Sequence, residues 1–134
     1  MTAALTLLRA VVAATPFDVW LDLDLIEAGD GKALVRLASR PDLLQQSGFL
    51  HAGVVAALID RTAGFAAASV AGAVLTSNFQ VTPYRPAIGD NFEAIAQVVR
   101  AGRTQVFVNV ELFATKGDDR KLVAGGTAVL AVTG

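Results

Sequence analysis

An aspartate within an apolar helix is the residue of this sequence that most needs a chemical explanation. Residues 52–70 are apolar almost throughout and predict a buried helix, yet Asp60 lies in the middle of them. An ionised carboxylate is costly to bury unless it is paired, hydrogen-bonded or neutralised. Catalysis is one explanation for Asp60. The alternative is a structural role, in which Asp60 bonds to a neighbouring helix end or to a basic residue of another subunit.

The start of the same helix offers a second chemical feature. The helix follows His51, the one histidine of the chain, so the first backbone amides are those of Ala52 and Gly53. Such amides have no acceptor within their own helix, and the helix dipole makes them good donors to an anion or a polarised carbonyl. This donor set suits an acyl oxyanion.

The spacing of these features predicts a site shared between subunits. His51 and Asp60 are separated by half a helical turn and by about 13 Å of axial rise, so one helix cannot bring them together. If both features serve one reaction, Asp60 must face the helix start of a second copy of the chain.

Composition limits the classes of function. The 134 residues predict a single domain spanning residues 1–134, and the net charge of −1 argues against a nucleic-acid partner. The absence of cysteine excludes thiol chemistry, and a lone histidine without cysteine removes the usual zinc sites. We therefore expect no metal and no cofactor.

The high apolar content, 54%, requires either a membrane or a large subunit interface. Residues 52–75 are long enough to span a bilayer, but Asp60 and Arg61 would lie at mid-depth, where charged side chains are costly. Residues 3–14 lack a basic leading segment and are more typical of a short amphipathic helix than of a signal peptide. A cytoplasmic homo-oligomer with no membrane partner is expected.

The remaining segments predict an antiparallel sheet. Residues 17–25 alternate apolar and polar side chains, as a half-buried strand does, and a turn at residues 28–31 joins them to a second alternating run at residues 32–38. After the helix, turn compositions separate four further strands. These are predicted at residues 74–84, 91–100, 105–115 and 122–132.

This order of elements predicts an α+β fold, with an antiparallel sheet of about five to six strands wrapped around one long central helix and a short N-terminal helix. Strands such as residues 105–113 carry almost only apolar or uncharged residues on both faces. We therefore expect another subunit to cover the outer face of the sheet, which favours a tetramer over a dimer.

From about residue 43 to the C-terminus, the sequence resembles the PaaI-type hotdog-fold acyl-CoA thioesterases of the thioesterase superfamily. The resemblance rests first on the pattern Gly48-x-x-His51-x-Gly53 and on Asp60 within Ala-Leu-Ile-Asp-Arg-Thr-Ala-Gly. Three turns and a closing strand follow in the order typical of that family. They are Tyr84-Arg85-Pro86-Ala87, Gly89-Asp90, Gly102-Arg103-Thr104 and Leu122-Val-Ala-Gly-Gly-Thr127.

The resemblance implies an acyl-CoA substrate and assigns roles at the site. Asp60 would be the general base or nucleophile, the N–H of Ala52 would polarise the thioester carbonyl, and Thr76 would lie near the nucleophilic water. The basic turns would contact coenzyme A through Arg85, Arg103 and Thr104, although exposed arginines beside turns are more often solvated.

Two positions depart from the family pattern. The family usually has His-Gly-Gly where this chain has His51-Ala52-Gly53, and it often has asparagine where Gln45 stands. Either Gln45 or Gln46 is a candidate to orient water, or both are ordinary loop residues. For His51 we favour a positioning role over proton transfer.

Three alternatives to hydrolysis follow from the same residues. A hotdog hydratase or dehydratase would need a carboxylate paired with a catalytic histidine, which the spacing of His51 and Asp60 leaves to chance. A non-catalytic acyl-CoA-binding module has mild support from Ala52 and Gln45, but it has no need of Asp60. A purely structural oligomer leaves Asp60 unexplained.

Overall fold

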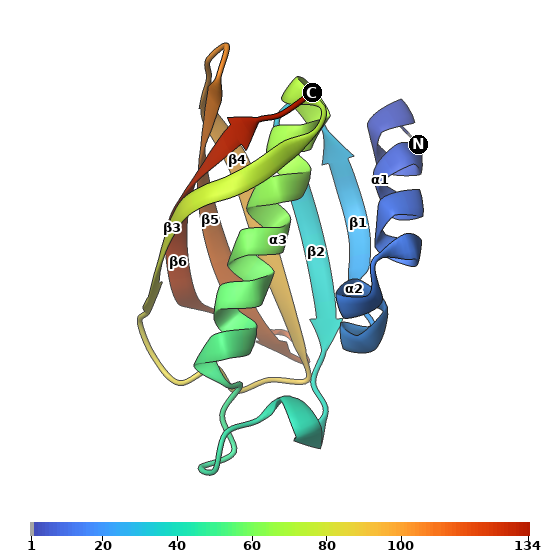
Figure 1. Ribbon diagram of the computed structural model, residues 1–134. Helices are drawn as coiled ribbons and strands as arrows, with labels where there is room; N and C mark the ends of the chain where they lie inside the picture. The colour runs from blue at the N-terminus through green and yellow to red at the C-terminus, as the bar shows by residue number, and fades with distance from the viewer. Residues whose placement is uncertain (1) are drawn as a thin grey trace.

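The computed structural model describes residues 2–134 and shows one sheet curved around a long helix (Figure 1). All strand pairs are antiparallel, and the order across the sheet is β1-β2-β4-β5-β6-β3. The helices are α1 (Ala3–Ala14), α2 (Pro16–Leu21) and α3 (Ala52–Ala71), with a short 3-10 turn at Pro41–Leu43. The strands are β1 (Asp24–Gly29), β2 (Lys32–Ala38), β3 (Val74–Pro83), β4 (Asn91–Ala101), β5 (Gln105–Lys116) and β6 (Asp119–Val132). The predicted fold class is confirmed.

The core lies between α3 and the concave face of the sheet. Leu58, Ile59 and Phe65 of α3 are buried there, against alternate residues of the strands. Gly126 of β6 lets the helix approach, because a Cβ at that position would lie 2.8 Å from Ile59 Cγ2. The helix has the length and mean hydropathy of a membrane span. Its buried face nevertheless packs on the sheet, as predicted for a core helix.

The prediction of a strand over residues 17–25 is wrong in its first half. Pro16 begins α2 instead, at a position where the fixed φ of proline suits a helix, and Asp22 ends it with a left-handed φ of 59°. The strand pattern required Asp18 to face solvent, but Asp18 is fully buried. The burial is explained by Arg61, which lies 43 positions away in the sequence and pairs with Asp18. The alternation of apolar and polar residues within one segment carries no information about a partner so far away in the sequence.

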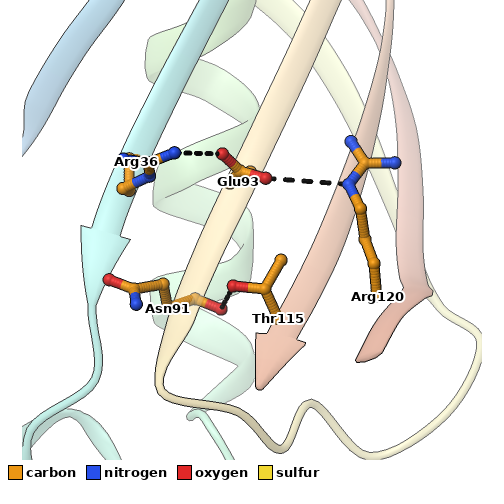
Figure 2. A network of polar contacts seen from close by, with 5 residues as sticks. All are labelled: Arg36, Asn91, Glu93, Thr115 and Arg120. Carbon is orange, nitrogen blue, oxygen red and sulfur yellow. Dashed lines mark hydrogen bonds and ion pairs between the residues drawn. The ribbon is translucent and has the colours of Figure 1, made fainter. Parts of the chain in front are cut away.

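The outer face of the sheet is less uniform than the sequence suggested. At one end it carries an ion-pair network, in which Glu93 of β4 lies between Arg36 of β2 and Arg120 of β6 (Figure 2). The guanidinium of Arg120 also stacks over the ring of Phe113, 3.7 Å from its centroid. An uncharged row crosses the middle of the same face. Its members are Gln80, Thr127, Asn109 and Gln97, each paired with the next across adjacent strands.

Candidate active site

Asp60 lies on the flank of α3 that faces the edge strand β3. Its neighbours Leu58 and Ile59 point into the core, whereas Asp60 is half-buried. One carboxylate oxygen, Oδ1, accepts a hydrogen bond of 2.6 Å from Thr76 Oγ1 of β3. Within residues 2–134 the other oxygen has no hydrogen-bond partner. The structure therefore brings Asp60 and Thr76 together and leaves one carboxylate oxygen free for chemistry.

A bulge in β3 directly follows Thr76. The pairing of β3 with β6 shifts register between Thr76 and Asn78, so that Ser77 is the extra residue, and its hydroxyl donates to the Val129 carbonyl at 3.1 Å. Bulges of this kind redirect side chains and are common beside active sites. Thr76 therefore bonds to Asp60, and Ser77 does not.

Arg61, the residue after Asp60, belongs to a different structural unit. Its Nε donates to Asp18 Oδ1 at 2.8 Å, a second nitrogen donates to Asp18 Oδ2, and the guanidinium lies 4.6 Å from the centroid of the Phe65 ring. Adjacent helical residues point apart, which is why Arg61 does not neutralise Asp60. Sequence reasoning missed Asp18. The available signal was an acidic residue in the first turn after Pro16, which is typical of a helix start.

His51 caps α3. Its Nδ1 accepts a hydrogen bond of 2.8 Å from the N–H of Gly53, and its carbonyl accepts from Val54 and Val55. This is the geometry of a positioning residue. It also corrects the expectation that Ala52 and Gly53 both offer free donors, since the capping imidazole occupies the N–H of Gly53. In the described part of the chain, the N–H of Ala52 has no acceptor, and Ala52 is exposed.

The loop before His51 is closed by Gln45. The side-chain oxygen of Gln45 accepts from the N–H of Ser47, its carbonyl accepts from Gly48, and its own N–H donates to Phe49. Gln45 therefore shapes the turn that leads into the helix. Gln46 does not line the pocket that lies at the start of α3.

A pocket of about 260 Å³ opens at the helix start. Gln45, Ala52 and Arg85 all line it. Arg103 and Thr104 are not brought there. They lie in the β4–β5 turn, where the Thr104 carbonyl accepts from Val132 beside the C-terminus, close to the opposite end of α3 (Figure 1). Within one chain, Arg85 is therefore far from the other two predicted coenzyme A contacts, Arg103 and Thr104.

Within one chain, the two reactive features also stay apart. Ala52 and Asp60 differ by eight residues of α3, which corresponds to about 12 Å of axial rise. A single thioester group cannot touch both. In residues 2–134, no three side chains of the His, Asp and Glu types gather as a metal site would require.

The comparisons with known proteins include one matching family model. The thioesterase superfamily model matches residues 47–121. A relative from Saccharolobus solfataricus, provisionally named an esterase, is 30% identical over 107 residues, which is 78% of this chain and 74% of the relative. A thioesterase family protein from Silicibacter pomeroyi superposes with a TM-score of 0.89 at 32% identity, covering 92% of this chain and 93% of the other.

Proteins of the PaaI type share the fold. The PaaI protein of the E. coli phenylacetic acid degradation operon has a TM-score of 0.89 at 23% identity, over 98% of this chain and 94% of that one. The phenylacetic acid degradation protein PaaI of Thermus thermophilus has a TM-score of 0.80 at 27% identity, over 89% and 100% of the two chains. With a matching family model over more than half of its length, this chain belongs to the thioesterase superfamily and has its PaaI-type hotdog fold.

Proposed function

We propose that the protein hydrolyses acyl-CoA thioesters at a site built by two subunits. The observation that carries the proposal is the hydrogen bonding of the Asp60 carboxylate. Thr76 holds one of its carboxylate oxygens at 2.6 Å, and the other oxygen is free within residues 2–134. A carboxylate fixed in this way can accept a proton from water or attack a carbonyl carbon directly.

The open edge of the sheet supports a shared site. β3 is an edge strand of ten residues, most of them exposed, whereas the other edge strand, β1, is packed against α1. A long unprotected edge is a template for pairing with another chain. Two β3 strands could pair antiparallel across a two-fold axis, with residue 79 of one chain opposite residue 79 of the other. In that register, Val74 of one chain would lie opposite Tyr84 of the other.

That pairing would also bring the two reactive features of the site together. Tyr84 and Ala52 line the same pocket, and Val74 and Asp60 line the same groove on the other side of the pairing. The two-fold arrangement would therefore carry the free N–H of Ala52 of the partner subunit toward Asp60. Because the operation is symmetric, each dimer would contain two such sites.

In this site, the thioester carbonyl oxygen accepts a hydrogen bond from the partner's Ala52 and is stabilised by the helix dipole. Asp60 takes a proton from water as the water oxygen attacks the carbonyl carbon. The tetrahedral intermediate then collapses, the carbon–sulfur bond breaks, and the thiolate of coenzyme A leaves with the proton that Asp60 took from water, which restores the carboxylate and releases the free acid. An oxyanion donor of this kind typically contributes about 2.7 to 4 kcal/mol, and a positioned base contributes roughly 10²–10⁴-fold.

Recognition of coenzyme A is assigned to the pocket at the helix start. Arg85 supplies a cation there for an anionic part of the coenzyme A leaving group. Contacts from Arg103 and Thr104 stay a prediction, since both residues lie at the other end of the sheet.

The sharpest test is a thiol-release assay of the purified protein against aliphatic and aryl acyl-CoAs. The parent should hydrolyse at least one of them, and Asp60→Asn should abolish turnover while still binding the substrate. Asp118→Asn, a change in the exposed β5–β6 turn, is the matched control and should behave as the parent does. Retention of activity by Asp60→Asn would contradict the mechanism. If the parent hydrolyses none of the acyl-CoAs, the result would contradict the hydrolase and favour the non-catalytic acyl-CoA-binding module.

A further inference from the structure

A groove of about 720 Å³ runs along α3 and begins at Asp60. It is bounded by α1 on one side and by the start of β3 on the other, and Figure 1 shows α1 and α3 on the same side of the sheet. Its lining is apolar apart from Asp60, Arg61, Ser69 and Thr76. The residues that α3 and the turn after it contribute are Asp60, Arg61, Gly64, Phe65, Ala68, Ser69, Gly72 and Ala73.

The spacing on α3 explains why the groove is long. Its lining residues recur every four positions and form one stripe from the middle of the helix to its end. From Asp60 to Gly72, this stripe covers about 18 Å of axial rise. This stripe forms the floor of the groove. The floor is low because Gly64, Ala68 and Gly72 have almost no side chain. A Cβ built at Gly64 meets nothing within 4 Å, so the space above it is open.

The wall formed by α1 is apolar and exposed. Leu7 and Val11, one helical turn apart, are 69% and 43% exposed, whereas Leu8 is buried and holds α1 in place. Exposed apolar surface of this kind is stabilised when an apolar ligand removes it from water. The charge of Arg61, which α3 contributes to the groove, is already compensated by Asp18.

We propose that this groove binds the acyl chain of the substrate, and that the preferred substrates are linear acyl thioesters of about eight to fourteen carbons. The assignment rests on the proposed function, because Asp60 and Thr76 mark the end where the thioester carbonyl would lie. Extended chains advance about 1.2 Å per bond, one third of the rise of an extended residue, so about 18 Å accommodates a chain of that length. A short acyl group would leave the apolar floor and wall in water.

The test is a chain-length series of acetyl-, octanoyl- and dodecanoyl-CoA, run on the parent and on Gly64→Leu. The parent should have a higher kcat/KM for the two longer substrates. In Gly64→Leu, the added side chain fills the groove, so the ratio of kcat/KM for dodecanoyl-CoA to that for acetyl-CoA should fall by about tenfold or more. Equal effects on all chain lengths would overturn the assignment.

A matched pair on α1 provides the second comparison. Leu7→Gln changes the groove wall, and Ala10→Gln introduces the same side chain at an exposed position outside the groove. Leu7→Gln should lower the preference for dodecanoyl-CoA, and Ala10→Gln should leave it as in the parent. If Leu7→Gln changes the oligomeric mass in sedimentation and leaves chain-length preference intact, the groove is a subunit contact and the assignment falls.

Binding of non-hydrolysable thioethers separates this proposal from the proposed function. Calorimetry should show that dodecyl-CoA binds the parent more tightly than ethyl-CoA, and that Gly64→Leu removes the difference. This result with no hydrolysis of any thioester would support the groove and contradict the hydrolase. Equal binding of the two thioethers by the parent would contradict the groove even if hydrolysis were observed.

Discussion

Two aspartates, one in α3 and one packed against it, have contrasting environments. Asp18 of α2 is fully buried, and Arg61 bonds to both of its carboxylate oxygens. Asp60, the neighbour of Arg61 in the chain, is half-buried and, among the residues that the structure describes, receives one hydrogen bond, from Thr76. A carboxylate with every acceptor satisfied contributes to structure, whereas one with a fixed but free oxygen is available to a substrate. The difference predicts that substitution of Asp60 lowers catalytic activity, whereas substitution of Asp18 lowers the stability of the fold.

The largest effect is expected in catalysis, from Asp60→Asn. Removing the base should lower kcat by about 10²–10⁴-fold, because the amide cannot accept a proton from water. Loss of a partly buried charge should leave the melting temperature equal to that of the parent or higher. Steady-state kinetics and calorimetry on the same preparation check both parts. A variant that unfolds easily and retains its kcat would reverse the roles of the two aspartates.

The opposite pattern is expected for Asp18→Ala. Leaving Arg61 without its buried partner should cost about 3 kcal/mol of unfolding free energy, measured from the urea midpoint, since breaking one half of a buried pair is strongly destabilising. The kcat of the folded fraction should stay within a few fold of the parent.

The double variant Asp18→Leu with Arg61→Met controls for packing. Replacing both charges with apolar side chains of similar size should recover most of the lost stability. If the double variant is as unstable as Asp18→Ala, the ion pair is not the cause of the loss.

A smaller effect is expected from Thr76→Val. This change removes the hydrogen bond to Asp60 and keeps the shape of the side chain, so kcat should fall by about tenfold, consistent with one hydrogen bond to a charged group. Thr76→Ser should retain most of the activity. Ser77→Ala, at the neighbouring bulge, should have little effect, and a larger loss there than at Thr76 would argue against the fixed carboxylate.

The smallest effect concerns His51. His51→Ala removes the cap on Gly53 and should cost about 1 kcal/mol of stability, and His51→Asn should recover it because asparagine caps well. Thermal unfolding of the three proteins measures this. A loss of kcat as large as that of Asp60→Asn, with unchanged stability, would make His51 a proton-transfer residue instead.

Much of the fold could be predicted from local patterns, because α3 and the strands after it combine strong periodicity with turn residues between them. The prediction failed where a side-chain partner decided the outcome. At Asp18 the partner is Arg61, so a segment that alternates like a strand folds as α2. At Gly53 the partner is the capping imidazole of His51, which removes one of the two expected donors.

At the candidate site, Asp60 and the start of α3 could be predicted because both follow from one helix and its anomalous charge. The approximate position of Thr76 followed from the family resemblance, and the bulge that orients it could not be seen in the sequence. The groove between α1 and α3 was also missed. It depends on how two helices are spaced across the sheet, and a run of alanine and glycine does not show this.

The most direct test of the shared site combines two inactive chains. Ala52→Pro removes the proposed oxyanion donor at the first helical position, where proline is tolerated, and the extended backbone of His51, with φ −60° and ψ 137°, suits a following proline. Ala52→Ser, which keeps the N–H, is its control. Heterodimers of Ala52→Pro with Asp60→Asn, purified through two different tags, should regain one intact site of two and about half the activity of the parent dimer. Heterodimers as inactive as each variant alone would contradict a site shared between subunits.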